Sequence, residues 1–299
     1  MAEIKKGKRM KRLIQKKLKK TKENLYYILS ALMIGLIVGG IDALFGRVLI
    51  AITDFRGRYI QILIWFLPIA GLFICWMYHH FNEMSLKGMT LVLETAQGKR
   101  ADIPLALVPL VMVGTWITHL FGGSAGREGV AVQIGATLSH WFARRFKFAD
   151  NRTILLIAGM AAGFGGLFQT PFAAVFFAME VVVTGKMLYQ AFLPSLVAAV
   201  TASTFSNALG LEKFAVPLKQ SFNLSESKTM FYMVILGVAF GLTGRVFSVL
   251  LKRAKAFMGE KLANPYKRIG FVSIPLAIIL FAFWNGRYCG LGTNLISQT

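Results

Sequence analysis

One short segment carries the residues whose types and spacing suggest chemistry. Residues 122–135 read Gly-Gly-Ser-Ala-Gly-Arg-Glu-Gly-Val-Ala-Val-Gln-Ile-Gly, so two glycine-rich turns flank one arginine and one glutamate. Gly126 and Gly129 allow the backbone to approach a ligand closely and to point successive N–H groups at one spot. The helix expected to begin here adds the positive end of its dipole. The segment therefore predicts an anion site built from backbone, without a lysine that would hold the anion too tightly.

Glu128 stands at the mouth of this expected site. When its carboxylate is ionised, it can occupy the site as a tethered anion. When it is protonated, it can leave and admit a free anion, so that one side chain couples proton and anion occupancy. The alternative is a structural ion pair between Arg127 and Glu128, although ionisable residues inside a membrane mark transport pathways by default.

Membrane-spanning helices must position this segment. Hydrophobic residues make up 56% of the 299 and charged residues only 16%, whereas soluble domains carry about 25% charged residues. No nucleotide-binding loop, metal-ligand cluster or nucleophile constellation is present in the sequence, so we expect a transporter without cofactor or metal rather than an enzyme. The apolar runs that we expect to be helical are 26–45, 59–78, 103–121, 153–168, 171–183, 188–205, 230–251 and 269–284.

Several of these runs are too short to cross a bilayer. The run 171–183 has thirteen residues and covers only about 20 Å as a helix, against a hydrocarbon core of roughly 30 Å. The stretches 84–95 and 129–142 are also short and are bounded by glycines or charges. Short interrupted segments are typical of discontinuous helices that line a cavity, which favours a channel or a secondary transporter.

The distribution of charge predicts an orientation and argues against nucleic-acid binding. Residues 1–23 hold eleven of the Lys and Arg residues and a net charge of +9 out of +21, which the positive-inside rule expects of a cytoplasmic N-terminus held at anionic lipid. The segment 252–268 has a net charge of +5 and is expected inside, whereas 206–229 has +1 and is expected outside. A segment at 46–58, with three arginines and one aspartate, is expected to be an external loop.

The motifs resemble one known family. Gly126-Arg-Glu-Gly-Val130, followed by Gln133-Ile-Gly135, resembles the G-R-E-G-P…V-Q-I-G signature of the CLC family of chloride channels and proton/anion antiporters. The stretch 161–180 resembles that family's next element, in which F-N-A-P precedes an apolar half-helix that ends in glutamate. Tyr288-Cys-Gly-Leu-Gly-Thr-Asn-Leu-Ile296 is similar to the glycine turn that opens the second half. The resemblance spans roughly residues 25–299.

Three departures from the family pattern indicate a branch. Val130 replaces the proline of G-R-E-G-P. The G-S-G-I-P selectivity turn is absent, and Lys87-Gly-Met-Thr-Leu-Val-Leu-Glu94 stands in its place, with Met89 near the position of the chloride-binding serine. Chloride/proton exchangers end the half-helix with two glutamates, where this chain has Glu180-Val181. Together these changes resemble the fluoride/proton antiporter branch, although Met89 as core filler is the alternative to Met89 as an anion contact.

The resemblance implies an all-α polytopic membrane protein with the CLC-type inverted-repeat fold and discontinuous half-helices. The expected parts are a basic cytoplasmic tail at 1–24, a first repeat at 25–205, an inter-repeat loop at 206–229 and the beginning of a second repeat at 230–299. A homodimer packed partly through 171–205, in a bacterial plasma membrane, is also implied. So are the partners: fluoride or chloride, protons and the lipid bilayer, without nucleic acid.

The resemblance also implies a function and its residues. Proton entry would drive fluoride export, and Glu128 would be the gating and proton-carrying carboxylate. One alternative is a chloride channel of the same fold, gated by Glu128 without proton coupling. Another is a non-transporting membrane protein that uses residues 1–23 as a binding tail. The residues expected to line the anion path are Gly88, Met89, Gly126, Arg127, Gly129 and Val130.

The lengths of the two repeats differ. Because inverted repeats contribute matching discontinuous helices to one site, the second repeat should be about as long as the first. We therefore expect the 299 residues to be a fragment. Reconstituted alone, they are expected to move no fluoride, whereas a form extended by second-repeat helices is expected to do so.

Overall fold

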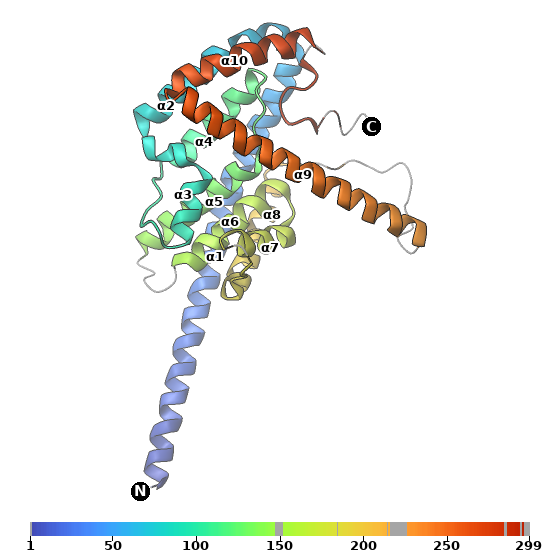
Figure 1. Cartoon of the computed structure of the whole chain (residues 1–299). Coiled ribbons are helices and arrows are strands. Elements are labelled where there is room, and N and C mark those ends of the chain that lie inside the picture. The colour runs from blue at the N-terminus through green and yellow to red at the C-terminus, as the bar shows by residue number, and fades with distance from the viewer. Residues whose placement is uncertain are drawn as a thin grey trace.

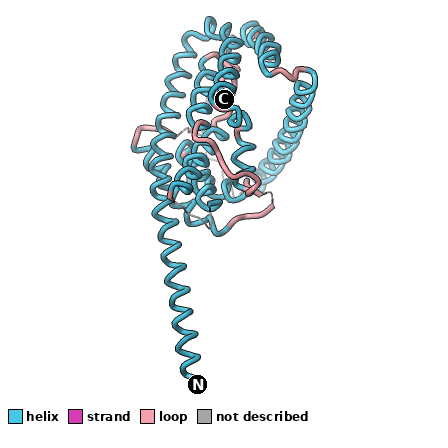
Figure 2. The backbone as a smooth tube through the Cα atoms, turned by 90° about the vertical axis from the view of Figure 1, so that its left-hand side faces the viewer, coloured by secondary structure: helices cyan, strands magenta, loops and turns pink. Residues whose placement is uncertain are grey.

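The expectation of an all-helical fold is confirmed. The computed structural model describes residues 2–146, 152–183, 185–213, 215, 226–283, 286–293 and 295. Within these ranges the regular structure is helical, apart from one isolated bridge between Val183 and Lys186. Figure 2 shows the helices stacked into one body, from which the N-terminal helix projects.

Ten α-helices and three short 3-10 helices form the described part of the chain. The α-helices are α1 (Ala2–Leu63), α2 (Leu67–Phe81), α3 (Met89–Ala96), α4 (Leu107–Leu120), α5 (Glu128–Arg145), α6 (Arg152–Phe168), α7 (Pro171–Val181), α8 (Phe192–Ala208), α9 (Ser227–Lys261) and α10 (Pro265–Ala282). The 3-10 helices are Ile64–Phe66, Glu83–Lys87 and Tyr189–Ala191.

Within the described residues, four helical stretches are long and apolar enough to cross a membrane, as expected of a multi-pass protein. They are Gln15–Phe81, Tyr189–Ala208, Ser227–Lys261 and Pro265–Ala282. The discontinuous helices are also present. With 8 residues in α3 and 11 in α7, neither reaches the roughly 30 Å of a hydrocarbon core.

The expectation of a loop at 46–58 is wrong, because α1 runs through this segment to Leu63 with one non-helical residue, Tyr59. Two arginines in the segment find partners beyond their own helix. Arg47 donates a hydrogen bond to the carbonyl of Leu209 at 3.0 Å, and Arg56 donates to that of His119 at 2.9 Å. These bonds explain why the charges do not interrupt the helix. Figure 1 shows the N-terminal part of α1 extending from the body.

Small residues bring α1, α5, α6 and α8 into close contact. A Cβ atom on Gly39 of α1 would lie 2.6 Å from the carbonyl oxygen of Ala202 on α8. A Cβ atom on Gly135 of α5 would overlap the backbone of Gly159 on α6. Close backbone approach of this kind is how helices pack in lipid, where no hydrophobic force drives them together. Helices α1, α5, α6 and α8 therefore form a tightly packed unit that holds the first turn of α5 in place.

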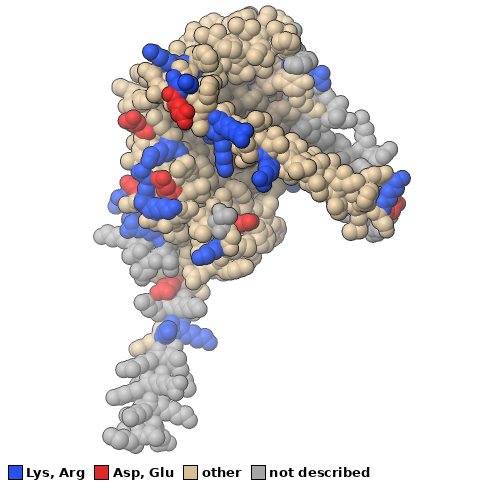
Figure 3. Space-filling model, in the orientation of Figure 1, with Lys and Arg blue, Asp and Glu red and all other residues tan. Residues whose placement is uncertain are grey.

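The last two helices pack less closely against this unit. None of the described side chains of α9 is buried, and in Figure 1 α9 reaches away from the body. Helix α10 packs beside α2, where Trp65 just ahead of α2 meets Phe281 of α10 with ring centroids 5.0 Å apart. In the view of Figure 3, basic and acidic side chains mingle over the α3 side of the body, and most of the remaining visible surface is uncharged.

Candidate functional site

The predicted anion segment forms the N-terminal turn of α5. Helix α5 begins at Glu128, with Arg127 at its N-cap. The first backbone hydrogen bond of this turn runs from the N–H of Ala131 to the carbonyl of Arg127, at 3.0 Å. In the part of the chain that the structure describes, the N–H groups of 128–130 have no backbone partner. Unpaired N–H groups at a helix start are the donors that bind anions.

Glu128 lies exposed at this turn. Its carboxylate folds back toward the preceding turn, so that a Cβ atom on Gly126 would lie 2.7 Å from Oε2. Gly126 is therefore required for the close approach of the carboxylate. Glu128 lines a cavity of about 330 Å³ together with Arg127, Phe168, Thr170 and Lys213, among other residues. The carboxylate thus has room both to occupy the helix terminus and to move away from it.

Arg127 does not pair with Glu128. Its guanidinium carbon lies 5.5 Å from the ring centroid of Phe168 on α6, which is a cation–π geometry. The Nε atom of Arg127 is buried and finds no hydrogen-bond partner in the described part of the chain. Among the described residues, no ion pair joins Arg127 to Glu128, so the structural ion pair that the sequence left open is not formed.

Gly88 forms a second turn that faces α5. Its φ of 51° is in the left-handed region that favours glycine, and its N–H donates to the carbonyl of Ser85 at 3.0 Å. A Cβ atom on Gly88 would lie 3.3 Å from Oε1 of Gln133, whose Nε2 donates to the carbonyl of Gly129 at 2.8 Å. Gln133 therefore connects the Gly88 turn to the first turn of α5.

A second cavity, of about 490 Å³, lies at this turn. Gly88, Val130 and Gln133 line it, and Arg268 of α10 is the charged residue among its lining side chains. Since Glu128 lines the first cavity and Val130 the second, the first turn of α5 lies between the two.

The structure does not bring all the predicted residues to these cavities. Gly126 and Gly129 shape the turn of α5 but are not among the lining residues of either cavity. Met89 is the first residue of α3, and it packs against the main hydrophobic core. It does not line the cavity that Gly88 lines. Phe168 and Arg268 were not predicted as site residues. An aromatic residue two positions after a glycine pair and an arginine in a basic segment carry little signal in a sequence rich in both types.

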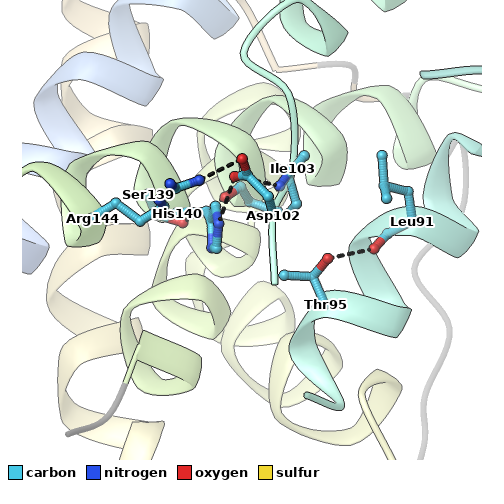
Figure 4. Close-up of polar contacts among 8 residues, drawn as sticks. Leu91, Thr95, Asp102, Ile103, Ser139, His140 and Arg144 are labelled. Carbon is cyan, nitrogen blue, oxygen red and sulfur yellow. Dashed lines mark hydrogen bonds and ion pairs between the residues drawn. The ribbon is translucent and has the colours of Figure 1, made fainter. Parts of the chain in front are cut away.

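A polar cluster lies at the other end of α5, which Figure 4 shows in close-up. Asp102, in the connection between α3 and α4, contacts Nε2 of His140 at 3.2 Å and forms an ion pair with Arg144. Burial by itself would raise the pKa of Asp102, but the hydrogen bond and charge of Arg144, with those of His140, hold the pKa below its usual range. The cluster ties the segment that follows α3 to the end of α5, and so fixes α3 and α5 relative to each other.

The described residues contain no group of three or more His, Cys, Asp or Glu side chains that could hold a metal ion. Of the glycine turn at 288–296, Asn294 and Ile296 lie outside the described residues. Gly290, at a φ of 77°, packs against the guanidinium of Arg56. This contact joins the glycine turn to α1 near the end of α4, where Arg56 donates to His119.

Comparison with known proteins places these features in a family context. The family model described as voltage gated chloride channel matches residues 70–299. A chloride/fluoride channel protein of Pseudomonas syringae pv. tomato is 31% identical over 274 residues, which are 89% of this chain and 60% of the relative. The chain thus spans less than two thirds of that relative's length.

Two solved structures are similar over most of the chain. The crystal structure of a CLC-type fluoride/proton antiporter is 45% identical with a TM-score of 0.88, covering 92% of this chain and 69% of that one. A slow cyanobacterial chloride/proton antiporter is 21% identical with a TM-score of 0.75, covering 90% of this chain and 66% of that one. At this identity, the second structure shows a shared fold alone.

Proposed function

Because the chain belongs to the voltage gated chloride channel family, we propose that it exchanges fluoride for protons across a membrane, with Glu128 as the gate and proton carrier. The observation that carries the proposal is the placement of Glu128 at the first turn of α5, exposed and free of Arg127, between two cavities. The fluoride/proton antiporter of known structure, at 45% identity, supports this choice of substrates.

The mechanism follows from the free N–H groups at 128–130. An ionised Glu128 places its carboxylate at the positive end of α5 and excludes other anions. Protonation removes the charge, the side chain leaves, and an anion takes its place. A return of the carboxylate after release of the proton expels the anion. Each cycle of the side chain therefore moves a proton and an anion past the same turn in opposite directions.

Selectivity for fluoride is proposed to come from the N–H groups and from the Gly88 turn. Fluoride is small and strongly hydrated, so a site must replace its water with close hydrogen-bond donors. The Gly88 turn packs against Gln133 of α5 and so forms the wall opposite the first turn of that helix. Met89, at the start of α3, is proposed to deny chloride the hydroxyl group that a serine would supply. Met89→Ser should then weaken discrimination against chloride. An unchanged ratio of fluoride to chloride efflux would show that Met89 only packs in the core.

We further propose a homodimer with a cytoplasmic N-terminus. Large apolar side chains are exposed on α7 and around the start of α8, including Phe172 at 67% and Tyr189 at 75%. They lie within 171–205, where this family is expected to form its dimer contact. The basic charge of 1–23 supports the orientation.

The test of the function is flux from loaded liposomes, followed with fluoride, chloride and pH electrodes. Since the known relative is longer, residues 1–299 and a form extended by second-repeat helices, here called the extended protein, are assayed side by side. Fluoride efflux with opposite proton movement by the extended protein supports the proposal. The name of the Pseudomonas relative includes chloride, and chloride efflux without proton movement would favour the channel alternative instead.

A further inference from the structure

Asp42 lies in the close contact of α1 with α6 and α8. Gly35, Gly39 and Gly46 recur on one face of α1 at the spacing that packs against α6 and α8. A Cβ atom on Gly35 would lie 2.7 Å from the carbonyl oxygen of Ala198, and one on Gly46 would collide with Leu211. Asp42 lies on the same face of α1, between Gly39 and Gly46, and is an acidic residue among small ones.

The carboxyl group of Asp42 is sealed from solvent. The residue is 0% exposed, and among the described residues neither of its carboxyl oxygens has a hydrogen-bond partner. It packs directly on α6, where a Cβ atom on Gly166 would lie 2.5 Å from Oδ2. The carbonyl of Gly166 is already bonded by the hydroxyl of Ser206 at 2.6 Å. Burying a polar group in this way carries a substantial desolvation cost.

The helices around Asp42 offer it no counter-charge. Helix α8 contains no charged or titratable residue, and the charged residue of α6 is Arg152, at its opposite end. The nearest cation along α1 is Arg47, which donates to the carbonyl of Leu209. A bare carboxylate in such surroundings is far more costly to bury than the neutral acid. The packing therefore selects the protonated form.

The same contact lies behind the wall of the Glu128 cavity. Gly166 is followed directly by Leu167 and Phe168, and both line that cavity. Phe168 also carries the guanidinium of Arg127 on its ring. A displacement of Gly166 would therefore move the wall that stands beside Glu128.

We propose that Asp42 is a second proton-binding site, whose carboxyl carries a proton in the packed structure and whose surroundings respond to anion occupancy of the Glu128 cavity. The proton comes from a hydronium ion, whose O–H bond breaks to leave water, and it forms an O–H bond with one carboxylate oxygen, which cancels the charge of the carboxylate. The response to fluoride rests on the proposed function, whereas the protonation of Asp42 does not.

Infrared difference spectroscopy of the protein in liposomes at neutral pH tests both parts. Wild type minus Asp42→Asn should show the C=O band of a protonated carboxylic acid, because asparagine keeps the shape but carries no acid. Carbon-13 labelling of aspartate should shift this band, which assigns it to an aspartate even where Asp42→Asn fails to fold. Asp102→Asn is the matched control. It removes an aspartate that is exposed and paired with Arg144, and it should leave the band in place.

Fluoride is then added to the extended protein in the Glu128→Gln background, so that Glu128 contributes no band of its own. A shift of the aspartate band on fluoride addition supports a link between Asp42 and the cavity. Absence of a protonated aspartate band would overturn the proposal entirely. If the protein transports fluoride but the band does not shift when fluoride is added, Asp42 is not linked to the cavity and has only a structural role. Failure of fluoride transport would refute the function while the band still decides the protonation of Asp42.

Discussion

The guanidinium of Arg127 lies over the ring of Phe168, 5.5 Å from its centroid, and not against the carboxylate of Glu128 beside it in the chain. This contact keeps the guanidinium of Arg127 away from the carboxylate of Glu128. Phe168→Leu should release Arg127 to pair with Glu128, because leucine offers no π face. We expect fluoride exchange by the extended protein to slow several-fold. Phe240→Leu, an exposed aromatic on α9, is the control, and an equal effect of both changes would contradict the role of Phe168.

The contact between α5 and α6 depends on glycine at both helices. Gly135→Ala would place a methyl group into the backbone of Gly159, and overpacking of this kind costs about 1–3 kcal/mol. The midpoint of thermal unfolding in detergent should fall accordingly. Gly237→Ala, at a position on α9 with nothing within 4 Å, should leave the midpoint unchanged or raise it, because alanine is the better helix former. A similar loss in both variants would show that the helix contact is not responsible.

The Asp102–Arg144 ion pair predicts an acid-sensitive step in stability. The folded pKa of Asp102 lies below the ordinary 3.8, chiefly through Arg144 acting against the effect of burial. Its stabilisation is therefore complete above about pH 4 and is lost as the pH falls through the folded pKa. Because the Asp102 side chain is 54% exposed, we expect at most about 1 kcal/mol. Thermal midpoints of Asp102→Asn and wild type should differ at pH 7 and converge in acid, whereas Glu260→Gln on α9 should match wild type throughout.

Arg268 is expected to draw anions into the cavity that Gly88 and Gln133 line. Its Nε and Nη2 atoms donate to the carbonyls of Leu262 and Ala263 at 3.1 and 3.3 Å, which holds the guanidinium in place. Arg268→Gln should raise the KM for fluoride about threefold or more at low ionic strength and much less at high salt. Lys267→Gln removes the same charge from an exposed neighbour. If the two variants behave alike, the cavity position of Arg268 is irrelevant.

The sequence indicated the helical class, the short half-helices and the glycine-rich turn at the start of α5 because each has a local cause. Apolar runs, glycine pairs and Pro171 act within a few residues of where they stand. It did not indicate the continuation of α1 through 46–58, because the partners of Arg47 and Arg56 are Leu209 and His119, distant in sequence. The burial of Asp42 is likewise invisible until α6 and α8 are placed against α1. Met89 shows the limit of arguing from resemblance. A motif suggested that Met89 contacts the anion, whereas in the structure it packs against the hydrophobic core.

Proton movement in the Glu128→Gln variant tests the central claim most directly. Glutamine keeps the shape of the side chain but cannot ionise, so it stands permanently for the protonated, open state of the gate. The extended protein carrying this change is loaded into liposomes, and fluoride and pH electrodes record efflux together. We predict that fluoride still leaves while the proton signal disappears. Protons that continue to move against fluoride in this variant would contradict the assignment of Glu128 as the proton carrier.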